Sequence, residues 1–329
     1  MRRREFITLL GGAAAVAGPL AARAQQPAMP SLGVLSPASA ATNARNIAAL
    51  RQGLRNLGYV EGRNIAIEYR FAEGISERLS RYATELVALK PVVIVVGSTS
   101  GIVSASKITQ TVPLIMIGAS EDPVLLGLVA SFARPGGNVT GFMLTLDQQI
   151  LGKRLQLLRD AIPGISRVGV MGNPDAPGDA AELRMVPSVA GQFGLQYRLL
   201  EVRTVDELEA AFATATREDL QALYITWNPV FNVHRARVVA MVASLRIPAI
   251  YGFRDFVQSG GLMSYGPDLP DLYRRSATYV DKILKGEKVG ELPLQLSEWY
   301  ELVINLKTAK ALGLSISEAF LLLADEVIE

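Results

Sequence analysis

The chain of 329 residues contains no cysteine and a single histidine, His234. Without cysteine it forms no disulfide framework, offers no thiol nucleophile and lacks the cysteine that anchors a lipoprotein. One histidine also leaves little material for a transition-metal site. Neither a G-x-G-x-x-G motif after a strand nor a G-x-x-x-x-G-K-[ST] motif occurs. We therefore expect no metal and no cofactor.

Hydrophobic runs of membrane-spanning length are also missing, although half of the residues are hydrophobic. The apolar run at 8–20 is too short to span a bilayer, follows three consecutive arginines and precedes a small-x-small sequence at 22–24. These features are typical of a signal peptide, and the arginines followed by Phe6 are similar to a twin-arginine export signal. We predict that residues 1–24 are a signal peptide cleaved near Ala24, and that the protein is periplasmic.

Neither sign of charge dominates the sequence. The full chain has 33 basic and 31 acidic residues, and without residues 1–24 it keeps 29 and 30, a formal net charge of −1. Proteins that bind the backbone of nucleic acids or an anionic membrane need a basic excess. We therefore expect no nucleic-acid partner.

The rest of the chain alternates between short apolar runs and amphipathic segments, separated by many of the 29 glycines and 17 prolines. Repeated strand–helix units predict right-handed crossovers and parallel sheets, and hence an α/β protein of two Rossmann-like lobes. Strands are expected at 32–36, 65–71, 92–96, 114–117, 167–172, 196–201, 222–227, 249–251, 262–265 and 301–305, and helices at 39–58, 76–89, 147–158, 180–193, 205–215, 231–245, 268–284 and 306–312.

We expect the residues after 251 to be divided between both lobes rather than to form a separate tail. We place residues 31–146 and 252–295 in lobe 1, and residues 147–251 and 296–329 in lobe 2. The chain then passes between the lobes more than once. Several crossings form a hinge, and a hinge between two lobes creates a cleft that can close on a ligand.

Polar turns follow two neighbouring strands of the first lobe. Residues 97–101 (GSTSG) end the strand at 92–96, and residues 118–122 (GASED) end the strand at 114–117. In a doubly wound sheet such turns meet at one edge, where hydroxyls and helix N-terminal N–H groups suit a small anion or carboxylate. The alternative is that these turns only cap helices.

The turn at 97–101 also matches the G-x-S-x-G nucleophile motif, with Thr99 in the position of the nucleophile. A nucleophilic hydroxyl needs a base, and His234 lies near a predicted helix start in the other lobe. Threonine is a poor substitute for serine at this position. We therefore do not expect an enzyme.

Six motifs, in their order and spacing, resemble the ABC-transporter substrate-binding proteins of the tryptophan/tyrosine-binding type. The resemblance implies a type I periplasmic binding protein fold, with two lobes, three crossovers and a small solute held between them for delivery to a membrane permease. The motifs lie at 122–124 (DPV), 133–141 (ARPGGNVTG), 251–257 (YGFRDFV), 260–268 (GGLMSYGPD), 279–286 (YVDKILKG) and 302–310 (LVINLKTAK).

The resemblance also implies where the ligand binds. Ser98, Thr99, Ser100, Ala119 and Ser120 are expected to line the first lobe's side of the cleft, and the ligand carboxylate is expected at Thr99, Ser100 and Ser120. Hydroxyls and adjacent backbone N–H groups would hold it there.

Asn228 is the candidate from the second lobe. Family members often carry an acidic residue at this position, which suits an ammonium group, whereas an amide forgoes the charge. The predicted ligand is therefore an aromatic amino acid or a related aromatic or branched carboxylate. Ser36 is a further candidate, and Tyr251 and Tyr265 would supply an apolar wall with a polar edge or would simply be core aromatics.

We thus expect a monomeric solute-binding protein whose partners are a small molecule and an inner-membrane ABC permease. A different class of function shares the same cleft. A ligand-sensing periplasmic protein would report to a membrane sensor or chemoreceptor, and only its docking surface would differ.

Overall fold

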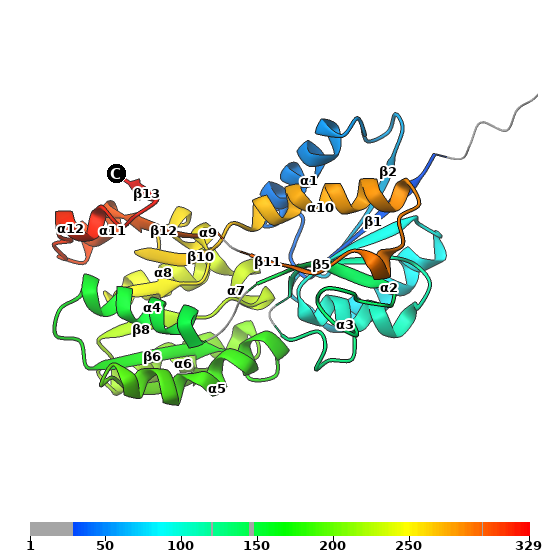
Figure 1. Cartoon of the computed structure of the whole chain (residues 1–329). Coiled ribbons are helices and arrows are strands. Elements are labelled where there is room, and N and C mark those ends of the chain that lie inside the picture. The colour runs from blue at the N-terminus through cyan, green and yellow to red at the C-terminus, as the bar shows by residue number, and fades with distance from the viewer. Residues whose placement is uncertain (1–28, 120, 145–147, 298) are drawn as a thin grey trace, which may run out of the picture.

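The computed structural model describes residues 29–119, 121–144, 148–297 and 299–329. Two lobes lie side by side, each built on a sheet with helices on both faces (Figure 1). The predicted signal peptide, residues 1–24, lies outside the described residues. Within these ranges, no helix is long and apolar enough to cross a membrane.

The described part of the first lobe has a six-stranded sheet in the order β11-β5-β4-β3-β1-β2, and all neighbouring strands are parallel. Its strands are β1 (Ser31–Ser36), β2 (Ala66–Phe71), β3 (Val93–Gly97), β4 (Leu114–Ala119), β5 (Val139–Met143) and β11 (Gln295–Leu296). Its helices are α1 (Ala44–Asn56), α2 (Glu77–Ala88), α3 (Thr99–Ile108) and α10 (Leu269–Leu284), with a 3₁₀ turn η2 (Val289–Glu291).

The second lobe has a seven-stranded sheet in the order β13-β12-β10-β9-β8-β6-β7, in which only the β10–β12 pair is antiparallel among the described strands. Its strands are β6 (Arg167–Gly172), β7 (Gln196–Glu201), β8 (Ala222–Ile225), β9 (Ala249–Tyr251), β10 (Met263–Pro267), β12 (Tyr300–Asn305) and β13 (Glu326–Ile328). Its helices are α4 (Gln148–Ala161), α5 (Pro177–Gln192), α6 (Leu208–Arg217), α7 (Pro229–Val233), α8 (Arg235–Leu245), α9 (Arg254–Gln258), α11 (Leu306–Ala311) and α12 (Glu318–Leu321), with a 3₁₀ turn η1 (Val205–Glu207).

Both faces of each sheet are buried, which explains why the central strands are continuous apolar runs. In β3, Val93 and Val95 pack into the core beneath α1 and α10, whereas Ile94 and Val96 pack into the core against α2 and α3. Successive strand residues point to opposite faces, so a run of this kind supplies two cores at once. The predicted α/β class with two mostly parallel sheets is confirmed.

Helix α10 returns to the first lobe although it follows eleven helices and strands of the second, α4 to β10. It lies along α1 (Figure 1). The helices approach closely at Gly53, where a Cβ would sit 2.3 Å from the carbonyl oxygen of Arg274. Only glycine allows this backbone approach, and α10 is thereby held on the first sheet.

One boundary of the predicted lobes is wrong. Residues 252–267 were expected in the first lobe, but they form α9 and β10 of the second lobe. Strand β10 pairs with β9 on one side and β12 on the other, so the sheet continues past Tyr251. In the described chain, the lobes are joined by the connections β5–α4, β10–α10 and β11–β12.

Candidate functional site

A cavity of about 730 Å³ lies between the two lobes. Its volume falls in the range of small-molecule sites, about 300–1,000 Å³. Residues from both lobes line it, all of them in turns or helix starts after the carboxyl ends of strands, as expected for this class of sheet. From the first lobe these are residues 73–77 and Ser100, and from the second they are Asn173, Asp175, Ala176, residues 203–205, Glu207, residues 228–230 and His234.

The turn after β3 is built around Ser98. Its backbone has φ +70° and ψ 159°, a conformation that non-glycine residues rarely adopt. The Ser98 hydroxyl caps α3 by accepting a hydrogen bond from the Gly101 N–H (3.2 Å), and it lies 3.1 Å from the Ser100 hydroxyl. The strained turn thus brings three successive hydroxyl residues, 98–100, to the edge of the sheet, and Ser100 lines the cavity.

Ser36, at the end of β1, lies in a neutral buried network. Its hydroxyl accepts hydrogen bonds from the Ala38 N–H (3.1 Å) and from Asn43 Nδ2 (3.2 Å). Asn43 also hydrogen-bonds with the hydroxyl of Tyr273, which reaches the same edge from α10. The lack of a Cβ at Gly97 makes room for that hydroxyl, because a Cβ would lie 2.9 Å from it.

The other predicted residues of the first lobe follow the same edge. Ala119 is buried at the end of β4, beside β3, and its carbonyl accepts a hydrogen bond from the Leu144 N–H (2.8 Å). Thr99 is buried at the first position of α3. Ser120 lies outside the described residues. Adjacent strands β1, β3 and β4 therefore bring Ser36, residues 98–100 and Ala119 to one edge.

Asn228, opposite them, has a largely structural side chain. Its Oδ1 caps α7 by accepting a hydrogen bond from the Phe231 N–H (2.9 Å), and its Nδ2 donates to Asp179 Oδ2 (2.8 Å). The residue is buried and lines the cavity. A buried carboxylate therefore lies directly behind the amide of Asn228.

Asp179 is in the first turn of α5 and is 2% exposed. Besides Asn228, the backbone N–H of Asn173 (2.7 Å) and the hydroxyl of Thr226 (3.0 Å) donate to its Oδ2. Burial raises the pKa of its carboxyl, with a smaller contribution from the nearby charge of Glu182, and the three hydrogen bonds lower it. The net result is a pKa of about 7. At neutral pH a cation beside Asp179 would favour its ionised form.

An arginine lies in the interior of the same lobe. Arg154 of α4 is buried and donates to Glu182 (2.7 Å), to the Tyr224 hydroxyl (2.6 Å) and to the carbonyl of Tyr265 (2.8 Å). Tyr224 also donates to Glu182. The Arg154–Glu182 ion pair fixes α4 and α5 against the sheet. It also places Glu182 near enough to Asp179 to affect the pKa of Asp179.

The two predicted tyrosines lie away from the cavity between the lobes. Tyr251 is fully buried on the face of β9 that packs against α8 and α9, and its ring stacks on Phe256 at 4.9 Å. Tyr265 stacks on Tyr300 at 5.8 Å and packs on the core formed by α4 and α5. Both are still within strands, so their side chains stand perpendicular to the sheet rather than beyond its edge.

Trp227 and Phe253 lie at the contact between the two lobes, but neither lines the cavity. They follow β8 and β9, their rings are 5.2 Å apart, and both pack on the core of the first lobe as well as lying on the second. Sequence reasoning missed Phe253. An aromatic residue directly after a strand at the sheet edge is the signal that would have identified it.

The lobes touch each other around the cavity. A Cβ on Gly74 of the first lobe would lie 3.6 Å from Pro229 O and from Val233 Cγ2 of the second. Arg45 of α1 donates to Asp255 (3.2 Å) and Gln258 (3.0 Å) of α9. The chain is therefore in a closed arrangement.

Acidic groups outnumber basic ones around this cavity. Arg203 forms an ion pair with Asp175 (3.1 Å), so its charge is largely compensated. Among the described lining residues, the charged side chains are Glu73, Glu77, Asp175, Glu207 and Arg203. This excess favours a ligand that carries a positive group.

The profile of the family described as ABC transporter substrate binding protein matches residues 31–328. The chain belongs to this family. Its members are substrate-binding proteins rather than enzymes. Among curated relatives, a tyrosine-binding protein of Clostridioides difficile (strain R20291) is 28% identical over 264 residues, which cover 80% of this chain and 75% of that protein.

Solved structures agree on the type I periplasmic binding protein fold. The ABC domain from Streptococcus pneumonia in complex with L-Trp superimposes with a TM-score of 0.83 at 24% identity, over 91% of this chain and 99% of that one. A ligand-free, open substrate-binding protein from Clostridium difficile gives a TM-score of 0.66 at 22% identity, with the same coverage.

Proposed function

We propose that the protein is a periplasmic solute-binding protein that closes on an aromatic amino acid and delivers it to an ABC permease. The observation that carries this proposal is the pairing of two edges across one cavity. Ser100 lines it from the first lobe, and Asn228, backed by Asp179, lines it from the second.

The two edges suit the two charged ends of an amino acid. Hydroxyls and the helix start at residues 98–100 are donors for a carboxylate. Buried Asp179 and the acidic lining residues supply the negative charge that Asn228 lacks, which favours an ammonium group over a ligand without one.

Closure follows from contacts that only the closed form makes. A ligand that touches both lobes binds this form more tightly than an open one and shifts the population toward it by that difference. The relatives whose names mention tyrosine and L-Trp support an aromatic side chain.

The test is a thermal-shift and calorimetric comparison of three matched ligands. Tyrosine has both charged groups, 3-(4-hydroxyphenyl)propionate lacks the amine and tyramine lacks the carboxylate. We expect a large shift in melting temperature with tyrosine, or with its tryptophan and phenylalanine counterparts, and weaker shifts with either truncated ligand. If the propionate shifts the melting temperature as much as the amino acid does, the ligand's ammonium group is not recognised. If no ligand shifts the melting temperature, the ligand is not an aromatic amino acid.

Delivery to a permease needs a separate measurement in cells. Uptake of the labelled ligand should fall in a strain that lacks the gene and recover when the gene is restored. Normal uptake with a lost chemotactic or transcriptional response would instead establish the sensing role.

A further inference from the structure

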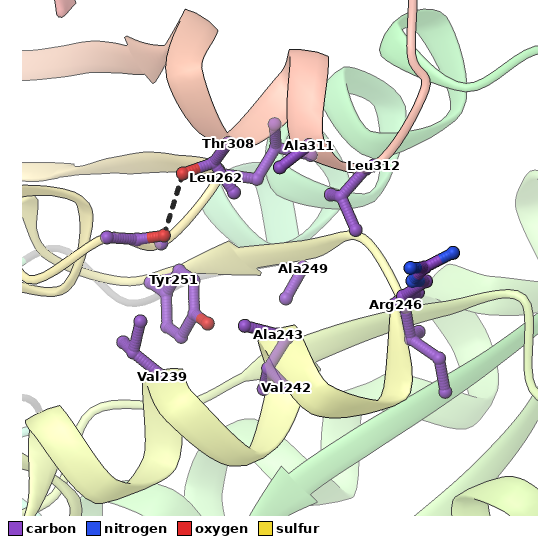
Figure 2. Close-up of a pocket in the computed structure, with 13 residues that line it drawn as sticks. Val239, Val242, Ala243, Arg246, Ala249, Tyr251, Leu262, Thr308, Ala311 and Leu312 are labelled. Carbon is purple, nitrogen blue, oxygen red and sulfur yellow. Dashed lines mark hydrogen bonds between the residues drawn. The ribbon is translucent and has the colours of Figure 1, made fainter.

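A second cavity, of about 250 Å³, lies inside the second lobe, away from the cavity between the lobes. It is bounded by α8, β9, the loop at 260–262 and α11 (Figure 2). Small side chains leave this space open, because Ala249 of β9, Ala243 of α8 and Ala311 of α11 all face it. None of the residues that line the cavity between the lobes lines it, whereas Tyr251, which the sequence had suggested for the amino-acid site, does.

The Tyr251 hydroxyl is an unpartnered polar group in this cavity. Tyr251 is 0% exposed, and its hydroxyl has no hydrogen-bond partner in the described chain. Figure 2 shows the hydroxyl pointing toward the space between Ala243 and Ala249. The ring is held in place by Phe256 and by Gly261, where a Cβ would lie 2.6 Å from the ring. A buried hydroxyl of this kind is costly unless something bonds to it.

A cation lies at the other side of the cavity. Arg246 ends α8 in the left-handed conformation (φ +53°), is exposed, and forms no ion pair with a described residue. In Figure 2, Ala243 and Ala249 lie between Arg246 and Tyr251. Thr308 adds no free donor, because its hydroxyl donates to the Gly260 carbonyl (2.8 Å).

We propose that this cavity is a second ligand site, for a single-ring aromatic carboxylate with a hydroxyl opposite the carboxylate. Arg246 pairs with the carboxylate, the apolar walls hold the ring, and Tyr251 hydrogen-bonds with the distal hydroxyl. An apolar cavity of about 150 Å³ is enough for benzene, so this one has room for a ring with two polar substituents. The site does not depend on the proposed transport function.

The test uses three probes in titration calorimetry: 4-hydroxybenzoate, benzoate, and 4-hydroxybenzyl alcohol. We expect 4-hydroxybenzoate to bind the most tightly. Tyr251→Phe keeps the ring but removes the hydroxyl, and it should weaken 4-hydroxybenzoate by about five- to tenfold while leaving benzoate unchanged. Arg246→Gln should weaken both acids but not the alcohol, whereas Arg55→Gln, an exposed arginine of the first lobe, should change nothing.

Location is tested by filling the cavity. Ala243 is exposed at the cavity wall, so Ala243→Leu should block binding without disturbing the core, and Ala213→Leu on the exposed face of α6 is its matched control. Three outcomes would each overturn the proposal: unchanged binding in Ala243→Leu, unchanged affinity for 4-hydroxybenzoate in Tyr251→Phe, or no binding of any probe. Loss of binding in Asp179→Asn but not in Ala243→Leu would place these acids in the cavity between the lobes.

Discussion

Five parallel strands follow the same order in the two lobes, β5-β4-β3-β1-β2 and β10-β9-β8-β6-β7, but the cleft edges of the lobes differ in chemistry. In the first lobe the buried polar groups at the edge are neutral: Ser36, Asn43, Ser98 and Thr99. In the second lobe the buried groups near the edge include three charged residues: Arg154, Asp179 and Glu182. The fold therefore does not determine the chemistry of either edge, which depends on the residues in a few turns and first helical turns.

This difference suggests a division of roles in binding a zwitterion. Hydroxyls and N–H groups can hold a carboxylate without a buried protein cation, so the empty first lobe does not carry the cost of a buried charge at this edge. A buried carboxylate suits an ammonium group but must be supported when the site is empty, and three donors to Asp179 Oδ2 provide that support. Substitutions of the buried charged residues in the second lobe test this division of roles most sharply.

The largest expected effect is on stability, from Arg154→Met. It leaves Glu182 buried without its cation, and removal of one partner of a buried pair costs about 3–5 kcal/mol. Urea unfolding followed by circular dichroism measures this loss. Arg154→Met with Glu182→Leu should recover much of it, because two apolar residues can replace a buried ion pair.

The matched control is Arg198→Met, which breaks an exposed ion pair with Glu218 in the same lobe. Such pairs contribute about 0–1 kcal/mol. Equal losses for Arg198→Met and Arg154→Met would mean that the buried pair gives the second lobe no special stability.

Asp179→Asn should have the next largest effect, on ligand affinity. The amide keeps the size of the carboxylate but not its charge, so an amino acid should bind at least about thirtyfold more weakly, as expected for loss of a buried charge partner. The deaminated analogue should be little affected. Asp175→Asn, which removes the charge of an exposed carboxylate of the same cavity, is the control in titration calorimetry. Equal losses in the two variants would exclude a special role for Asp179.

The raised pKa of Asp179, about 7, predicts two pH dependences of opposite sign. The ammonium ligand needs the ionised carboxylate, so affinity should fall by up to about tenfold per pH unit as the pH drops below 7. The free energy of unfolding should instead decrease as the pH rises from about 4 to 7, because the folded protein binds the proton more tightly than the unfolded chain and loses this advantage when the proton leaves. Asp179→Asn should flatten both profiles, and a pH-independent affinity in the parent protein would contradict this assignment.

These residues also show how far sequence reasoning reaches. The two-lobed fold and the hydroxyl turn at 98–100 could be predicted because strand patterns and turn residues are local signals. Asp179 could not, since the helix expected at 180–193 begins three residues earlier, at Pro177, and an acid in a first turn usually serves only the helix dipole. Arg154 had a readable signal, because it falls on the same helical stripe as Leu151 and Leu158.

Tyr251 illustrates the limit of such reasoning most clearly. Its position at the end of a strand predicted a place at the edge, but the direction of a side chain depends on the register of β9 within the sheet. Register is set by pairing with neighbouring strands and is not visible in a three-residue strand. The same missing information led to the wrong lobe boundary at residue 252.

On the neutral edge we expect a smaller effect. Thr99→Ala with Ser100→Ala removes two hydroxyls and should weaken amino acid and deaminated analogue alike, by about tenfold, because both carry the carboxylate. Ser106→Ala, farther along α3, should leave affinity unchanged in the same calorimetric titration. A double variant that discriminates between the two ligands would place the ammonium on the first lobe and reverse the assignment of the edges.

The smallest expected effect concerns the contact between the lobes at Arg45. Its guanidinium is about half exposed and donates to Asp255 and Gln258, so the contribution to closure is that of a surface pair, below about 1 kcal/mol. If opening separates α1 from α9, Arg45→Gln should weaken every ligand by about two- to fivefold, and more at low salt than at high salt. Arg55→Gln on the same helix should change neither the affinity nor its dependence on salt. Unchanged affinity would mean that the contact persists in the open form, which would place it at the hinge and leave closure to the ligand and to the two edges alone.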